Sequence, residues 1–177
     1  FVVTNFIKCN SKEEAQNFVS KNIDTGIINN PSRYSEIDNM NFDDLKELIS
    51  KDNLIGSHTV NHKKLTEIDN ADELNYEKIN SKKELEKMLD CKINNFAWTY
   101  GDINSINKKS YNIIKKNYHN IFSGIRGNNI QTSSSVYFRD ELSPFYSEDL
   151  VNAFLNGYSD FYYYKNRKKL LNFDINV

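Results

Sequence analysis

The chain has 177 residues, of which 38% are hydrophobic and 27% charged, an ordinary composition for one globular domain with a core. Its 23 basic and 24 acidic residues give a formal charge of −1 and are mixed along the chain, so no electrostatic footprint for nucleic acid stands out. No apolar run reaches the length of a membrane span, and the first residues lack the order of a signal peptide. We therefore expect one domain over residues 1–177, with no membrane span and no nucleic-acid partner.

Apolar runs and amphipathic segments alternate along the chain, a pattern typical of βα units and of an α/β fold. Strands are predicted at residues 1–3, 26–28, 54–57, 96–98, 121–123 and 136–138. Helices are predicted after caps at Ser11, Asn41 and Ser147, over residues 74–89, and around residues 106–114. Residues 127–135 are predicted to be a loop, and the aromatic run 161–164 is interpreted as a packed terminal strand rather than a platform for carbohydrate.

Several polar and aromatic residues follow the ends of predicted strands. In βα barrels the chemistry gathers where strands end and the following loops begin. We therefore expect these side chains to face one common rim. They are His58, His62, Trp98, Tyr100, Asp102, Arg126, Arg139 and Asp140.

His58 and His62 are two of only three histidines in the chain and lie four residues apart. On a helical turn this spacing places both imidazoles on one face, close enough to share a cation. Neutral imidazole is a good ligand for zinc, cobalt, iron or nickel, and a catalytic site would add a carboxylate and a position for water. The alternative is a pair of surface or capping histidines without a metal. His119, alone on a helix flank, is expected to be structural.

Two segments resemble motifs of a known family. Residues 56–62, Gly-Ser-His-Thr-Val-Asn-His, with Leu65 after them, resemble the second signature motif of the polysaccharide deacetylase family, which is the NodB-homology or carbohydrate esterase family 4-like family. Residues 96–102, Phe-Ala-Trp-Thr-Tyr-Gly-Asp, are similar to its third motif. The resemblance extends in order and spacing over residues 42–127, and it implies a deformed or incomplete (β/α) barrel of the NodB-homology type.

The resemblance also implies metal-dependent hydrolysis of an N- or O-acetyl group on a sugar of a poly- or oligosaccharide, with zinc as the expected divalent cation. It implies that His58 and His62 bind the metal and that the backbone N–H of Tyr100 stabilises the oxyanion. The residues expected to contact the carbohydrate substrate are Trp98, Tyr100, Asp102, Arg126 and Arg139. For Trp98 the alternative is core packing, and for the two arginines it is ordinary ion pairing.

The resemblance has gaps. The family's first motif, a Thr-Phe-Asp-Asp-Gly run with the general base and a metal-binding aspartate, belongs upstream of the strand that matches residues 1–3. Residues 41–44 imitate it, but they lie too near His58 and fit a helix start better. Thr99 stands in place of the usual proline, Ala97 in place of a frequent arginine, and no late histidine matches the family's acid. We therefore expect a domain without its N-terminal strand and first motif, a general base outside this chain, and Asp140 as a hypothetical substitute ligand.

Two other interpretations stay open. One is a glycan-binding or regulatory module of deacetylase type that has lost its base and acid, and the other is a structural α/β domain whose histidines bind nothing. For an enzyme, a secreted or cell-surface glycan is the favoured substrate, and glycan assembly inside the cell is the alternative. The sequence carries no indication of the oligomeric state.

Overall fold

The computed structural model describes residues 1–23, 37–129 and 135–175. At the centre of this part of the chain lies a parallel sheet in the order β1-β2-β3-β4. The strands are Gly56–Ser57, Asn95–Ala97, Asn120–Phe122 and Val136–Tyr137. Val2 adds an isolated parallel bridge to Ser57, so the predicted first strand is reduced to a single bridge beside β1.

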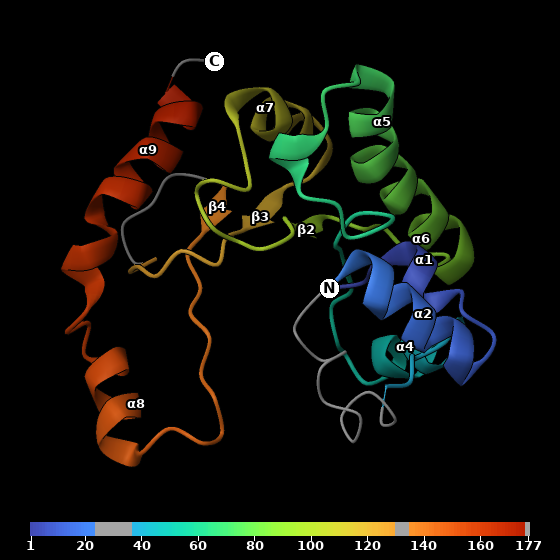
Figure 1. Ribbon diagram of the computed structural model, residues 1–177, viewed down its shortest axis with the longest axis horizontal. Helices are drawn as coiled ribbons and strands as arrows, with labels where there is room; N and C mark the ends of the chain where they lie inside the picture. The colour runs from blue at the N-terminus through green and yellow to red at the C-terminus, as the bar shows by residue number, and fades with distance from the viewer. Residues whose placement is uncertain (24–36, 130–134, 176–177) are drawn as a thin grey trace.

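Helical segments precede, connect and follow the strands (Figure 1). Before β1 come α1 (Thr4–Ile7), α2 (Lys12–Asn22) and α4 (Phe42–Ser50). Between β1 and β2 come the short 3₁₀ turn η2 (Leu65–Glu67) and a continuous helical stretch made of α5 (Ala71–Asn75), η3 (Tyr76–Asn80) and α6 (Ser81–Leu89). Then α7 (Lys108–Asn117) joins β2 to β3, and β4 is followed by α8 (Glu148–Leu155), η4 (Asp160–Tyr163) and α9 (Tyr164–Ile175). In Figure 1 the sheet lies between the α5–α6 stretch and α9, and α8 lies away from it.

The predicted caps start the helices as expected. The Ser11 hydroxyl accepts the N–H of Glu14, and the Asn41 side chain accepts two N–H groups and forms a complete capping box with Asp44. Ser147 caps α8 in the same way, accepting the N–H of Leu150. These helix starts were predictable because a cap is a local pattern of a few residues.

The segment η3 is a π-helical turn inside the α5–α6 stretch, which the sequence did not predict. It places two consecutive charged side chains in the interior, Glu77 at 1% exposure and Lys78 at 0%. In a regular α-helix consecutive residues point about 100° apart. Isolated π turns often occur at functional sites, and the part that Glu77 plays is described below.

All four strands are parallel, so their carboxyl ends meet at one edge of the sheet. A tight contact joins the loops after β2 and β3 at this edge. Gly101 has φ +67°, its O accepts the N–H of Gly124 at 2.9 Å, and a Cβ on it would lie 2.8 Å from the Gly124 backbone. Helices and loops cover the sheet, whose described strands do not close on themselves. The structure thus confirms an α/β fold of the incomplete barrel type.

Two predictions near the ends of elements need correction or comment. The aromatic run 161–164 is helical, not a packed terminal strand, and its four side chains are exposed. The reason is local, because Gly157 with φ +75° and the turn bonds to Gly157 O and Ser159 O lead the chain into a helix. The strand predicted at 26–28 lies outside the described residues. Among the described helices, none has the length and apolar character needed to cross a membrane.

Candidate functional site

His58 directly follows β1, and hydrogen bonds fix both its backbone and its ring. Its N–H donates to Val2 O at 2.8 Å, and its Nδ1 lies 2.8 Å from Ala97 O on β2. Because a carbonyl oxygen only accepts, Nδ1 carries the proton and Nε2 carries the free lone pair. Burial is the main cause that lowers the pKa of His58, to about 4; the hydrogen bond to Ala97 O opposes this shift, and the positive charge of Arg139 adds to it. The ring is therefore neutral at pH 7 and able to bind a cation through Nε2.

His62 lies opposite His58 on a loop rather than on a helix. The two ring centroids are 5.1 Å apart at an angle of 68°. His62 adopts the left-handed backbone conformation, with φ +62°, and its N–H donates to Thr59 Oγ1 at 3.0 Å. Burial lowers its pKa as well, and its buried Nδ1 has no hydrogen-bond partner among the described residues. A buried ring nitrogen without a hydrogen-bond partner is unusual. In a metal site this nitrogen would donate its lone pair to the metal.

Tyr100 is the third predicted site residue that lies beside the histidine pair. It lies in the loop after β2, again in the left-handed conformation with φ +64°, and its ring centroid is 5.3 Å from that of His62. Its side chain is 52% exposed. Within residues 1–23, 37–129 and 135–175, no acceptor is paired with its backbone N–H. The predicted oxyanion donor and the predicted metal ligands thus share one corner of the sheet edge.

The other residues predicted after β2 are engaged in the structure of the loop. Trp98 is 1% exposed, belongs to the core, and donates its indole N–H to Asp102 O at 3.1 Å. The Asp102 carboxylate accepts the N–H of Asn104 and the hydroxyl of Ser105, both at 2.6 Å. For Trp98 this geometry favours core packing over contact with a sugar. A substrate contact by Asp102 stays a prediction.

Arg126 and Asp140 lie together in a separate hollow of about 830 Å³ between the β3 and β4 loops and α8. The buried Arg126 guanidinium pairs with Asp140 at 2.7 Å and Asp160 at 2.8 Å, and it also donates to Phe154 O. The hypothesis that Asp140 substitutes as a ligand beside the histidines is wrong, because its carboxylate is directed to Arg126. For Arg126 the observed contacts favour the ion-pair alternative.

Arg139 lies between the two regions. Its Nε donates to Ser123 O at 3.0 Å, and its guanidinium lies 4.8 Å from the centroid of the Phe1 ring. It is close enough to His58 for its charge to act on that imidazole. Its predicted contact with substrate therefore stays a prediction, and it is better placed for one than Arg126.

The donor set can be compared with what a divalent cation needs. His58 offers Nε2, and His62 offers a partnerless Nδ1, so two neutral nitrogen donors are present and fit. A catalytic zinc site takes three protein ligands. Among the described residues, no group of three His, Cys, Asp or Glu side chains forms such a set.

Comparison with known proteins agrees with this arrangement. The family model for polysaccharide deacetylase matches residues 11–119, which is more than half of the chain. The chain belongs to the polysaccharide deacetylase family. Members of this family are generally metal-dependent. No curated protein matches the chain significantly.

Two solved structures resemble the fold. One is BC0361, a polysaccharide deacetylase from Bacillus cereus, with 20% identity and a TM-score of 0.56 over 66% of this chain and 37% of that chain. The other is BA0330 from Bacillus anthracis, with 21% identity and a TM-score of 0.54 over 67% of this chain and 36% of that chain. This polysaccharide deacetylase family chain therefore spans little more than a third of the length of these solved chains.

Proposed function

We propose that this protein is a metal-dependent carbohydrate deacetylase that hydrolyses an acetyl group from a sugar of a poly- or oligosaccharide. The observation that carries the proposal is the histidine pair. Two neutral imidazoles face each other across 5.1 Å, one with a free Nε2 and one with a buried, partnerless Nδ1, within the family's second motif. A secreted or cell-surface glycan is the substrate that we favour.

The residues of this chain would act in distinct ways. A divalent cation, zinc in our proposal, would polarise the acetyl carbonyl and acidify a water molecule for attack. His58 would hold it through Nε2, while the bond from Nδ1 to Ala97 O keeps the ring in the correct tautomer and orientation. The backbone N–H of Tyr100 would donate to the oxygen that becomes negative during attack. The exposed Tyr100 ring beside His62 would contact the sugar.

We further propose that the third ligand and the general base come from the family's first motif, upstream of Phe1. Two features support this part of the proposal. The described residues offer two donors where three are needed, and the chain covers 37% of the Bacillus cereus deacetylase. Residues 1–3 lie beside β1 through the Val2–Ser57 bridge, which is where a preceding strand would bring such a motif.

Elemental analysis tests the proposal directly. Metal content would be measured after purification without chelator for the chain, for the chain extended upstream, and for His58→Ala/His62→Ala in both lengths. We expect near-stoichiometric metal in the extended protein, its loss in the double variant, and acetate release from an acetylated glucosamine oligomer that follows the metal. Absence of metal from both wild-type lengths would refute the mechanism.

The second candidate function is a glycan-binding module of the same family. The observation that favours it is that, within the described part of the chain, no third metal-ligating side chain is grouped with the two histidines. Such a module would bind the acetylated oligomer and release no acetate, even when it is extended upstream and loaded with metal. Calorimetric binding together with acetate measurement separates the two functions.

A further inference from the structure

Glu77 is a buried carboxylate that forms its hydrogen bonds with the loop between the two histidines. It is 1% exposed and lies on the π-helical turn η3. Its Oε2 accepts the backbone N–H of Val60 at 3.0 Å and of Asn61 at 2.8 Å, and its Oε1 accepts the side-chain amide of Asn61 at 2.7 Å. Within the described residues no ion pair is formed by this carboxylate, so the loop amides are its main compensation for burial.

The loop that Glu77 binds is conformationally demanding. Thr59 and His62 both have positive φ, +68° and +62°, although neither is a glycine. Each such residue costs about 1–2 kcal/mol and persists only where the surrounding contacts define the conformation. Between them lie Val60 and Asn61, the two residues whose backbone N–H groups Glu77 accepts. The carboxylate therefore acts on the part of the loop that turns the His62 ring toward His58.

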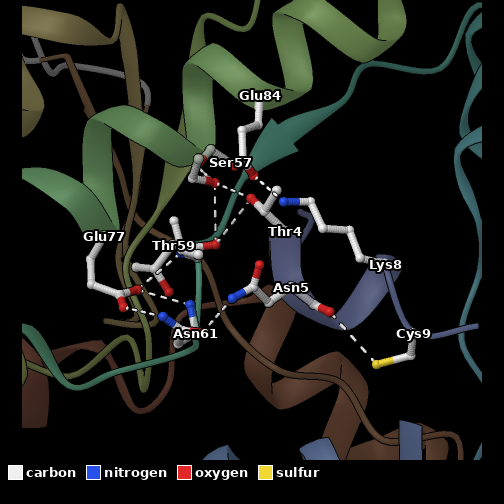
Figure 2. Close-up of polar contacts among 11 residues, drawn as sticks. Thr4, Asn5, Lys8, Cys9, Ser57, Thr59, Asn61, Glu77 and Glu84 are labelled. Atoms are coloured by element: carbon white, nitrogen blue, oxygen red, sulfur yellow. Dashed lines mark hydrogen bonds and ion pairs between the residues drawn. The ribbon is translucent and has the colours of Figure 1, made fainter. Parts of the chain in front are cut away.

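Residues of α1 bind the same loop from the side opposite to Glu77, as Figure 2 shows. Asn5 donates from its backbone to Val60 O at 3.0 Å and from its side chain to Asn61 Oδ1 at 2.7 Å. Asn61 thus bridges Asn5 and Glu77. Thr59 O accepts the N–H of Thr4 and the hydroxyl of Ser81, both at 3.2 Å.

We infer that Glu77 is a positioning residue, which holds the 59–62 loop so that His62 stands beside His58 for one cation. The inference rests on the proposed function for its metal, and on the contacts above for its mechanism. Residues that hydrogen-bond directly to metal ligands typically contribute about 10- to 100-fold to metal affinity, and Glu77, which acts on His62 through the loop backbone, is expected within the same range.

The test uses Glu77→Gln in the longest available chain, with cobalt(II) as the probe. Glutamine keeps the shape but has one carbonyl oxygen, so at least one of the loop's donors meets an NH₂ group. We expect cobalt affinity to fall about 10- to 100-fold, the visible cobalt spectrum to change, and the Val60 and Asn61 amides to exchange faster with deuterium. Glu77→Asp keeps the charge and should recover part of the affinity.

Glu84→Gln is the matched control. Glu84 lies on α6 and pairs with Lys8 at 2.6 Å, as Figure 2 shows, and no hydrogen bond or ion pair among the described residues links it to the 59–62 loop. This variant should bind cobalt as the wild type does. If Glu77→Gln does not fold, Asn61→Ala takes its place, because it removes the side-chain bridge between Asn5 and Glu77 and leaves the two backbone bonds of the carboxylate. We expect it to weaken cobalt binding about tenfold.

The outcomes separate the two ideas. If the wild type binds cobalt and Glu77→Gln binds it with the same affinity and spectrum, the positioning role is refuted and the proposed function stands. If the wild type binds no cobalt, the proposed function fails and the metal role of Glu77 fails with it. Unchanged exchange at Val60 and Asn61 in Glu77→Gln would show that the carboxylate does not anchor the loop.

Discussion

Acidification should destabilise this protein through His58 before it protonates most carboxylates. Burial holds the pKa of His58 at about 4, against an ordinary value of 6.5. Between pH 6.5 and about pH 4, His58 is protonated in the unfolded chain but neutral in the folded protein, so the free energy of unfolding falls as the pH falls. Above pH 6.5 both states are neutral and this contribution is fully retained. The perturbation that isolates it is His58→Asn, whose amide can still donate to Ala97 O and does not titrate.

The magnitude follows from the interval between the two pKa values. At about 1.36 kcal/mol per pH unit, the fall from 6.5 to about 4 gives an upper value of about 3 kcal/mol. Solvent around the half-buried ring reduces this amount, so we expect a difference of about 2 kcal/mol between pH 7 and pH 4. Metal would compete with protons for the same nitrogen and must be removed.

Urea unfolding in the presence of chelator measures this effect. Wild type and His58→Asn would be unfolded at several values between pH 7 and pH 4, and the free energies compared at each pH. Carboxylates contribute equally to both proteins, so their difference reports His58 alone. Parallel curves for the two proteins would refute the assignment of a buried neutral imidazole.

Three other changes have expected outcomes that denaturant unfolding can measure. Gly101→Ala should cost about 2–4 kcal/mol, because its Cβ would lie 2.8 Å from the Gly124 backbone at a positive φ. Gly157→Ala should cost less, about 1–2 kcal/mol, because φ is also positive (+75°) but the nearest atom to its Cβ would be a side-chain oxygen, Asp160 Oδ2 at 3.3 Å, rather than backbone. Burial lowers the pKa of Lys78 to about 7, so Lys78→Met should stabilise the protein by at least about 1 kcal/mol at pH 6, and at pH 9 the gain should shrink as the buried amine becomes neutral. Arg126→Ala should cost about 3 kcal/mol, because it leaves two aspartates and a carbonyl oxygen without their buried partner. Equal stabilities for Gly101→Ala and Gly157→Ala, a pH-independent gain for Lys78→Met, or a neutral Arg126→Ala would contradict these arguments.

The parts of the fold that depend on local patterns were predictable. Helix caps at Ser11 and Asn41, the strand before His58, and the histidine spacing are encoded within a few residues each. The parallel sheet follows from the alternation of apolar and amphipathic segments, and the rule that chemistry gathers at strand ends brings together three of the eight residues predicted to share a rim, His58, His62 and Tyr100, but not Arg126 and Asp140. This is why the His58, His62 and Tyr100 corner could be anticipated before the structure was known.

Features that depend on tertiary contacts were not predictable. One example is the loop conformation of His62, whose partners Glu77 and Asn5 come from segments distant in sequence. The expectation of a helical turn at the histidines was wrong for the same reason, because the left-handed residues end any helix there. One signal for Glu77 existed, since it falls on the inward stripe of the predicted 74–89 helix beside Leu74. A charged residue at a core position is the pattern to examine in such helices.

The π turn has a consequence for the kinds of mutation that this protein tolerates. A helix with such a turn accommodates one residue more than regular α geometry, so deletion of one residue within Tyr76–Asn80 would leave an ordinary helix with a similar apolar stripe. The fold would survive, but either Glu77 or Lys78 would rotate by about 100° out of the interior. A single-codon deletion in this turn could therefore give a relative that retains the fold but no longer holds the histidine loop through Glu77.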